Sequence, residues 1–362
     1  EVSEEVKSTT IATYLKKAGY DLAFGGKVHL PHSLTPKALG FVDITNNERD
    51  VLAEEAAKYI KQKHSKPYFM VVSLINPHDI CYMAIRDFAE SEEDKGILKH
   101  GKIEVATLDK ALELPLGVGK DEFFAEYCPP LPANFDPQKD EPKAISAMLK
   151  ARSFRISARN KYTKEQWRMH RWAYARLTEE VDRQIQVILE ALKTSGQEEN
   201  TLVIFSSDHG ENDASHKMEH KTVLYEESAN IPFIAMFKGK ISPGQVNTKS
   251  LVSNGLDLLP TICDYAGING QSDPRGISLR SLFEGNNVTS RKTLGIESEI
   301  GKMVVSEDGF KYVRYDVIGI EERLMDLNID PYEKTHVTNN KSYSKELLRL
   351  RKSFNQEWFP NL

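Results

Sequence analysis

The chain has 362 residues, of which 40% are hydrophobic and 28% charged, and its formal net charge is −5. This composition is typical of a folded globular protein and argues against a disordered chain or a dedicated nucleic-acid binder. No apolar run approaches the roughly 18 residues of a membrane span. The three cysteines, Cys81, Cys128 and Cys263, lie far apart and indicate no disulfide framework.

The first part of the chain alternates helices and strands. Helical spacing predicts helices at 6–18 and at about 48–63, and each is followed by a strand, at 20–26 and at 68–74. The second strand is almost continuously apolar, which is typical of a strand buried on both faces. Helices that alternate with parallel strands predict a doubly wound α/β sheet flanked by helices.

A long segment at 83–160 interrupts this pattern. It is rich in charge, proline and short apolar pieces, and we interpret it as an irregular excursion over one edge of the domain. Thr163–Gln166 then forms a capping-box pattern, which opens a long amphipathic helix that closes at Gly196. Residues 201–206 predict another buried strand.

The pattern changes after about residue 285. Segments 303–306 and 310–316 flank an Asp308-Gly309 turn and predict a hairpin, beside which 324–327 can pair, and 343–355 predicts a terminal helix. We therefore expect an α/β domain at 1–285 and a small antiparallel α+β subdomain at 286–362. Asn287–Thr289 matches a glycosylation sequon by pattern alone.

Two candidate site segments follow the first two strands. Lys27 and His29 come after the strand at 20–26 and point to the same side of an extended segment. A cation beside an imidazole suits an anionic substrate and a proton transfer, although a surface lysine and a structural histidine are the simpler interpretation. His78 lies at the carboxyl end of the strand at 68–74, where α/β sheets bind ligands; a histidine that caps a local hydrogen bond is the alternative.

Two further candidates follow the strand at 201–206. Asp208 and His209 are adjacent at a strand end and can both reach one divalent ion, while an Asx-turn is the alternative for the aspartate. Lys221 lies in a polar stretch in which His216 and His220 match the H-x-x-E-H pattern of zinc peptidases. That pattern needs a stable helix, whereas this stretch resembles a loop, so we do not favour a peptidase.

Two other features are open to a functional interpretation. Cys128-Pro-Pro resembles the start of a modified-cysteine motif, but Pro132 stands where that motif needs an arginine, so we interpret Cys128 as structural. The basic and aromatic run at 150–176 could form a rim for a sulfated saccharide, or it could be a solvated helix face with its tryptophan in the core. The cationic and aromatic side chains concerned are Arg152, Arg155, Arg159, Trp167, Arg171 and Trp172.

Taken together and in this order, these segments resemble the sulfatase family of the alkaline phosphatase superfamily. GY and GKVHLP within 19–31 resemble the family's GY…GKWHLG segment, SLINPH at 73–78 its S-F-x-x-PH segment, and NTLVIFSSDHGE at 200–211 with HKTVLYEESANIPFI at 220–234 its most recognisable block. SNGLDLLPTICDYAG at 253–267 resembles the helix after that block, and RLMDLNIDPYEKTHV at 323–337 the closing motif. The order of the matches is more specific than any one of them.

The resemblance implies an alkaline-phosphatase-like fold and a role for each candidate residue. Lys27 would bind the sulfate and steady the nucleophile, and His29 would be the proton partner of the nucleophile. His78 and Lys221 would contact sulfate oxygens and help the bridging oxygen leave. Asp208 and His209 would bind one divalent metal ion, Ca²⁺ by resemblance, although an imidazole where the family more often has asparagine also suits Mn²⁺ or Zn²⁺.

The family's nucleophile is a formylglycine, made from Cys or Ser in C/S-x-P-S/A-R, and this motif is missing from the printed sequence. In the family it lies upstream of the segment that resembles 19–31, as does an Asp-Asp pair that ends the first strand. We therefore expect a truncated chain, with a natural pseudoenzyme as the alternative. As printed, the chain is expected to lack the central strand of its sheet and not to turn over.

The expected function is a metal-assisted sulfuric-ester hydrolase that acts on a sulfated carbohydrate or on an aryl or alkyl sulfate. The alternatives are a phosphodiesterase or phosphonate monoester hydrolase of the same superfamily, and a non-catalytic sulfate-binding protein. The expected partner is a small-molecule or oligosaccharide sulfate ester, with no nucleic acid and no membrane span. Family members are often exported, so the resemblance implies a periplasmic or secreted location; no oligomeric state is predicted.

Overall fold

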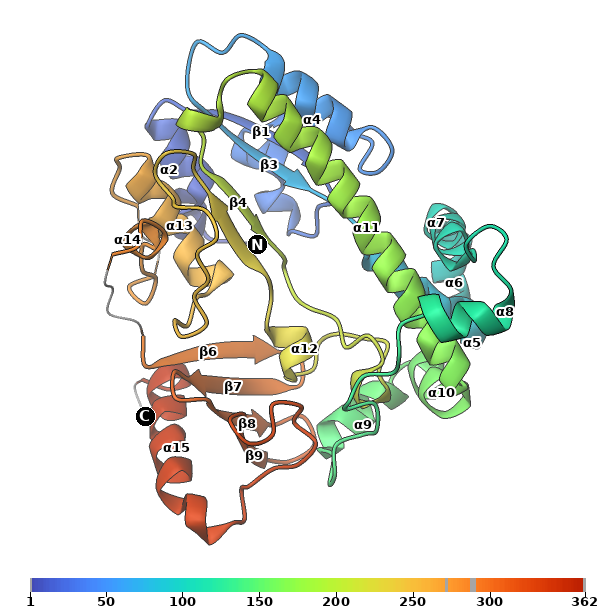
Figure 1. The fold of residues 1–362 in the computed structure, drawn as a ribbon. Coiled ribbons are helices and arrows are strands. Elements are labelled where there is room, and N and C mark those ends of the chain that lie inside the picture. The colour runs from blue at the N-terminus through green and yellow to red at the C-terminus, as the bar shows by residue number, and fades with distance from the viewer. Residues whose placement is uncertain (1, 271–272, 287–290, 361–362) are drawn as a thin grey trace.

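The computed structural model describes residues 2–270, 273–286 and 291–360. An α/β part, a group of helices and a small antiparallel sheet lie side by side in the molecule (Figure 1). The sequon at 287–289 lies outside the described residues. None of the described helices has both the length and the apolar character that crossing a membrane requires.

The N-terminal sheet is parallel. Strand β1 (Asp21–Gly26) lies between β2 (Val42–Asp43) and β3 (Tyr68–Ser73), and it pairs with β3 over its whole length. The predicted helix at 6–18 is divided into two, because the Thr10 hydroxyl accepts a hydrogen bond from the backbone N–H of Thr13 and begins a new helix. Helices α1 (Glu4–Ser8) and α2 (Ile11–Lys17) precede β1, α3 (Pro36–Leu39) precedes β2, and α4 (Leu52–Lys61) precedes β3.

A second pair of strands continues the α/β part. Strand β4 (Val203–Ser206) pairs with β5 (Phe233–Met236) in antiparallel fashion, and within the described residues no strand joins β3 to β4. Both pairs nevertheless pack on the same helices. Met70 of β3 contacts the hydrophobic cluster of Ile60 and Leu192 that Val203 and Met236 also contact.

The opposite face of the N-terminal sheet is covered by α2 and α13 (Asn254–Tyr265), which pack around Leu22 and Phe69. Helices therefore cover both faces, and the predicted α/β class is confirmed. The short helix α14 (Arg280–Phe283) follows α13.

The prediction that the strands at 68–74 and 201–206 are buried on both faces is wrong. Every residue of β3 is only half-buried, and Phe205 of β4 is 37% exposed. The physical reason is that β3 and β4 each have a hydrogen-bonded neighbour on one side only in the part of the chain that the structure describes.

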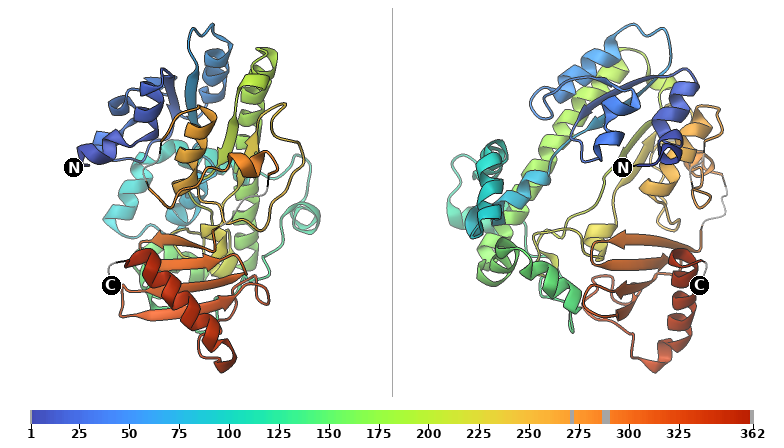
Figure 2. Two further views of the ribbon diagram at one scale, coloured as in Figure 1. Left: turned by 90° about the vertical axis from the view of Figure 1, so that its left-hand side faces the viewer. Right: turned by 180° about the vertical axis from the view of Figure 1, so that it is seen from behind.

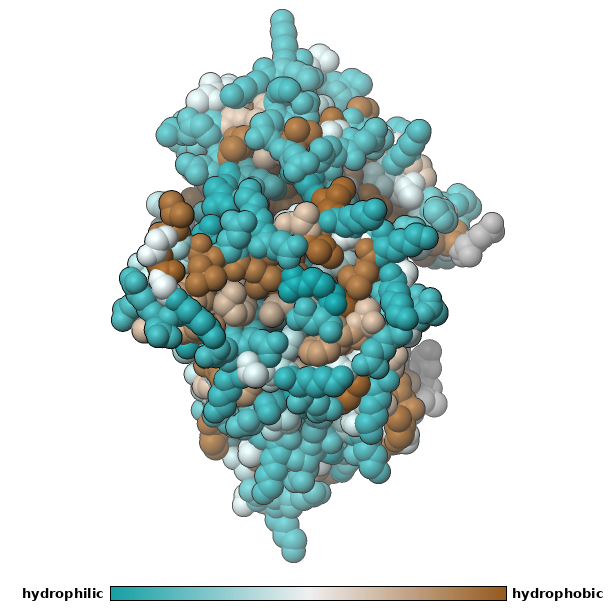
Figure 3. Space-filling view, turned by 90° about the vertical axis from the view of Figure 1, so that its right-hand side faces the viewer, coloured by the Kyte–Doolittle hydropathy of each residue, from teal (hydrophilic) through white to brown (hydrophobic). Residues whose placement is uncertain are grey.

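The segment at 83–160 is mainly helical rather than irregular. Several of its helices pack around Trp167 in the first turns of α11 (Lys164–Thr194), which begins with the predicted capping box at Thr163. The surface on this side is mostly hydrophilic with hydrophobic patches (Figure 3). Ile103 and Leu116 of the same segment are exposed. The elements are α5 (Tyr82–Phe88), α6 (Glu92–His100), α7 (Lys102–Leu112), α8 (Lys120–Glu122), a π-helical turn (Phe123–Tyr127), α9 (Lys143–Lys150) and α10 (Ser153–Lys161).

The C-terminal unit is a four-stranded antiparallel sheet in the order β6-β7-β8-β9, in which β7 and β8 form the predicted hairpin, β9 pairs beside it, and β6 is an additional strand. Helix α15 (Ser344–Trp358) lies across its outer face (Figure 2), where Phe354 packs against Tyr312. The other face, through Met303, packs against α9 and the loop that precedes α12 (Glu226–Ala229). The strands are β6 (Thr293–Ser298), β7 (Gly301–Ser306), β8 (Phe310–Tyr315) and β9 (Glu321–Asp326).

Candidate active site

Lys27 lies directly after β1. Its backbone N–H donates to the Ser73 carbonyl at 2.9 Å, so the pairing of β1 with β3 continues up to this residue. Gly26 has a φ of +108°, and a Cβ there would lie 2.1 Å from the Ser73 oxygen. Only glycine permits this close approach, which places Lys27 at the carboxyl edge of the sheet.

His78 opens a short 3₁₀ turn (His78–Cys81) after β3. The next residue, Asp79, is fully buried and binds Arg49 through two hydrogen bonds of 2.5 and 2.9 Å. Burial alone would raise the pKa of Asp79, but the nearby His78 imidazole and the hydrogen bonds from Arg49 hold it below its ordinary value. A charged, fixed carboxylate therefore lies beside His78, whose Nδ1 is 3.9 Å from Asp79 Oδ1.

Asp208 and His209 follow β4 and are exposed. The His209 Nδ1 lies 2.8 Å from the Gly210 carbonyl oxygen, which can only accept, so Nδ1 carries the proton and Nε2 keeps a free lone pair. That Nε2 is 3.5 Å from Asp208 Oδ2. A histidine fixed through its other nitrogen and turned toward a carboxylate is the usual state of a metal ligand, so the pair fits as two ligands of one ion.

The structure brings these strand ends toward Lys221. Burial and the nearby Lys221 ammonium lower the pKa of Lys27, while Asp208 opposes that effect. Neither ammonium forms a hydrogen bond or an ion pair with any residue of the described ranges. Two cations therefore share one region without a bound carboxylate.

Acidic and thiol groups that the sequence did not single out surround Lys221. Burial raises the pKa of Glu211 to about 8, although Lys221 opposes the shift. Glu219 is 2% exposed, neither of its carboxylate oxygens has a hydrogen-bond partner among the described residues, and burial raises its pKa as well. Burial raises the pKa of Cys81 to about 12, so this thiol does not supply a thiolate nucleophile. Their burial depends on contacts between distant segments, which the sequence pattern does not reveal.

His29 does not interact with the groups around Lys221. It is exposed, and it makes no hydrogen bond or ion pair with the described part of the chain. Across that same part, no group of three or more His, Cys, Asp or Glu side chains is placed to hold a metal ion.

The peptidase alternative does not fit the structure. His216 has a φ of +54° in a three-residue 3₁₀ turn, and the chain from Met218 to Lys221 is not helical, so no helix presents the two histidines together. His216 instead stacks on Tyr225 at 3.9 Å between ring centroids. Burial lowers the pKa of His220 to about 2, with further effects from Arg155 and Lys221, so this imidazole is neutral.

Cys128 is buried, its pKa is raised by burial, and its carbonyl accepts a hydrogen bond from Arg168. This supports the structural interpretation.

Most of the basic run at 150–176 is engaged in structural contacts. Arg152 pairs with Glu93 and Asp94, Arg159 with Glu141, and Arg171 with Asp213. Trp167 is fully buried in the helical core, and Trp172 packs against Phe123. A saccharide rim made of all these side chains is therefore wrong.

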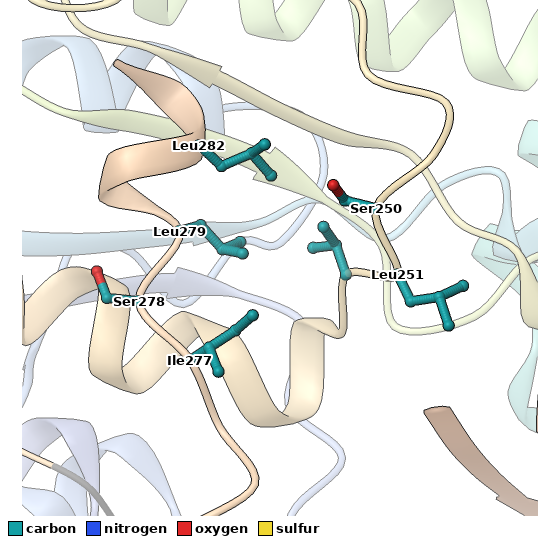
Figure 4. A pocket seen from close by; sticks show the side chains of 7 residues that line it. Ser250, Leu251, Ile277, Ser278, Leu279 and Leu282 are labelled. Atoms are coloured by element: carbon teal, nitrogen blue, oxygen red, sulfur yellow. The ribbon is translucent and has the colours of Figure 1, made fainter. Parts of the chain in front are cut away.

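A small apolar cavity lies elsewhere, between the segment that precedes α13 and the segment that leads into α14 (Figure 4). It is lined by Leu251, Leu279 and Leu282 among others, and its volume of about 10 Å³ has room for a single water molecule at most. We assign it no role in the site.

Comparisons with known proteins agree with the motif order. A family model described as Sulfatase matches residues 3–268, and one described as N-sulphoglucosamine sulphohydrolase, C-terminal, matches residues 214–358. The Delta 4,5-hexuronate-2-O-sulfatase of Bacteroides thetaiotaomicron is 28% identical over 366 residues, which cover 94% of this chain and 70% of that protein.

Solved structures show the same fold. A 2-O GAG sulfatase superposes with a TM-score of 0.75 at 25% identity, over 96% of this chain and 73% of that one. The phosphonate monoester hydrolase of Agrobacterium radiobacter superposes with a TM-score of 0.65 at 19% identity, over 95% of this chain and 79% of that one. At that identity the second likeness concerns the fold alone.

Proposed function

Because the chain belongs to the sulfatase family, we propose that it forms the sulfate-binding part of a sulfuric-ester hydrolase site. The observation that carries the proposal is the convergence of Lys27 and Lys221 without a counterion in the described ranges. Two ammonium groups close together repel each other, and a bound anion removes that cost. A sulfate ester is an anion of the required charge and size.

The chain's own residues can bind and polarise such an ester. Lys27 and Lys221 would hold sulfate oxygens, where fixed cations stabilise the charge that develops as the ester bond breaks. His78, which lies beside the buried Asp79 carboxylate, would hydrogen-bond the bridging oxygen as it leaves. His29 is free in the structure to act as the proton partner that the resemblance implies.

Asp208 and His209 would hold the divalent ion, which would supply Lewis-acid stabilisation of a sulfate oxygen. Ca²⁺ is the ion that the resemblance favours, and the imidazole also suits Mn²⁺ or Zn²⁺. The nucleophile that the resemblance implies is a formylglycine, and the C/S-x-P-S/A-R motif that would carry it does not occur in the printed sequence.

We propose a sulfated saccharide as the substrate class. The support is that the named relative acts on a hexuronate 2-O-sulfate and that the superposed structure is a 2-O GAG sulfatase. The phosphonate monoester hydrolase shares the fold, and no feature of this site favours its substrate over a sulfate ester.

Release of inorganic sulfate from singly sulfated saccharides, by protein purified from its native source, tests the proposal. The variant Lys221→Met should lower kcat/KM by about 10²- to 10³-fold, because a fixed donor to the reacting group is removed. Lys249→Met removes an exposed cation and is the control. Peptide mapping of the same preparation shows whether a C/S-x-P-S/A-R peptide with formylglycine is present.

The results separate the alternatives. Sulfate release that Lys221→Met abolishes and Lys249→Met leaves intact supports the hydrolase. Sulfate-ester binding without release, together with no formylglycine peptide, favours the non-catalytic sulfate-binding protein. Equal activity of the two variants contradicts the role of Lys221.

A further inference from the structure

One arginine of the basic run, Arg155, has no carboxylate partner among the described residues. Arg155 lies on α10 between Arg152 and Arg159, both of which are paired with carboxylates. In contrast, Arg155 forms no hydrogen bond or ion pair with any residue that the structure describes, and its Nε is buried without a partner. A guanidinium that is partly withdrawn from water and uncompensated is costly, and an anionic ligand would offset that cost.

The packing places Arg155 near the candidate active site. Ile156, its neighbour on α10, packs against a hydrophobic cluster that contains Met218 and Ile300. Helix α10, the loop that leads to Lys221 and the turn between β6 and β7 therefore meet at one place. Arg155, Glu219 and Glu299 are each adjacent in sequence to one of these three packed residues, so their charged groups lie around the edge of the same cluster.

The electrostatic effects at this place agree with the packing. Burial lowers the pKa of Arg155, and Glu219 and Glu299 are the nearby carboxyl groups that oppose the shift most. Beyond burial, Arg155, Lys221 and His209 each lower the pKa of His220, so all three groups lie near this imidazole. Burial also raises the pKa of Glu219, which favours its neutral form and leaves the charge of Arg155 available.

We propose that Arg155 is a specificity-determining residue that binds a second anionic group, a carboxylate or a further sulfate, on the saccharide whose sulfate ester lies at Lys27 and Lys221. The inference rests on the proposed function and narrows its substrate class to saccharides with two negative charges. The planar fork of a guanidinium matches both kinds of oxyanion through paired hydrogen bonds. Glu299 is exposed in the turn between β6 and β7, and its carboxylate disfavours ligands that place an anion on that turn.

Three ligands with the sulfate ester at the same position test the proposal: a neutral disaccharide with one sulfate, its uronic-acid counterpart with the same sulfate, and its disulfated counterpart. Dissociation constants are measured by calorimetry for the wild-type protein and for Arg155→Gln. The variant should bind one or both doubly charged ligands about 10- to 100-fold more weakly and should bind the singly charged ligand as the wild type does. The ligand that loses affinity identifies the carboxylate or the sulfate as the partner.

Two further variants control for charge and folding. Lys161→Gln removes an exposed cation from the end of the same helix, where it pairs with Glu90, and should leave all three affinities unchanged. Arg155→Lys keeps the charge without the fork and should give intermediate losses. The Tm of Arg155→Gln should fall little, because the guanidinium forms no hydrogen bond or ion pair with the described residues and contacts only the Phe154 ring, at 5.8 Å from its centroid.

Equal losses for all three ligands, with or without a lower Tm, would assign Arg155 to the framework of the site and overturn the proposal, as would no loss for any ligand. If the wild-type protein binds the doubly charged ligands through Arg155 but releases no sulfate from them, the proposed hydrolase function fails while the role of Arg155 stands.

Discussion

At the end of β1 a single backbone conformation sets the position of Lys27. Gly26 has a positive φ, and the space where a Cβ would lie is occupied by the Ser73 carbonyl. Gly19 also has a positive φ, of +86°, but no atom lies within 4 Å of the place of its Cβ. A comparison of alanine substitutions at Gly19 and Gly26 therefore distinguishes the cost of backbone strain from the cost of a steric conflict.

We predict that Gly19→Ala costs about 1–3 kcal/mol of unfolding free energy from backbone strain alone, whereas Gly26→Ala costs more because β1 must also move away from β3. Gly26→Ala should in addition weaken sulfate-ester binding, since Lys27 is displaced. Urea denaturation and calorimetric titration measure the two effects. Equal stability and equal affinity of the two variants would show that the contact with Ser73 has no part in positioning Lys27.

The sequence predicts site residues best where they directly follow a strand. Lys27, His78, Asp208 and His209 all do, and the edge of an α/β sheet is where such residues meet. Glu219 could not be predicted in this way, because its burial arises from packing between α10, α11 and a loop. The catalytic roles of Lys27, His78, Asp208 and His209 stay predictions.

At the scale of elements, α11 and the C-terminal sheet show what local patterns predict and what they miss. The capping box and the Asp-Gly turn are local signals, and both are present: the Thr163 cap of α11 and the turn at Gly309 between β7 and β8. The sequence does not predict the helices between 83 and 160, because each is short and is buried by distant segments: several pack around Trp167 of α11, and α9 packs against the C-terminal sheet.

The C-terminal sheet is joined to the α/β part by a buried charge cluster. Lys311 on β8 is fully buried and contacts Glu333 at 2.8 Å and Glu226, the first residue of α12, at 3.0 Å. Figure 1 shows α12 beside the ends of β6 and β7. Burial raises the pKa of Glu333 to about 7, although Lys311 opposes the shift.

We predict that Lys311→Met lowers the unfolding free energy by about 3–5 kcal/mol at neutral pH, because a buried carboxylate loses its partner. Glu333 has a folded pKa above its unfolded value of 4.5, so its contribution to stability falls as pH rises from there through about 7. Without Lys311 that pKa should be higher still, so the loss should be smaller near pH 5 than near pH 8. Denaturant unfolding at both pH values measures it.

Lys302→Met is the matched control, since Lys302 pairs with Glu297 on the surface of the same sheet and such a pair contributes about 0–1 kcal/mol. A loss for Lys311→Met as small as that of the control, or one independent of pH, would contradict the account of the buried cluster.

At the scale of the whole molecule, the α/β part carries two strand pairs that share covering helices but are not joined by hydrogen bonds within the described residues. Phe205 on β4 lies opposite Ile234 on β5, and they are 37% and 60% exposed. They are on the same face as Val203, which packs toward α11 and α4, yet no helix covers them. Together with the unpaired edges, they form an apolar strand surface of the kind that associates.

We predict that the chain with the printed sequence self-associates through this strand surface, and that the double variant Phe205→Thr and Ile234→Thr shifts it toward the monomer. Threonine keeps a high strand propensity, so β4 and β5 should still pair while the exposed apolar area falls. Size-exclusion chromatography with light scattering over a concentration series measures the change. Val246→Thr, which alters an isolated exposed side chain outside any strand, should leave the association of the wild type unaltered. The prediction is contradicted if the wild-type chain stays monomeric at every concentration, or if the double variant associates as the wild type does. Either result would mean that the side chains of Phe205 and Ile234 do not mediate association.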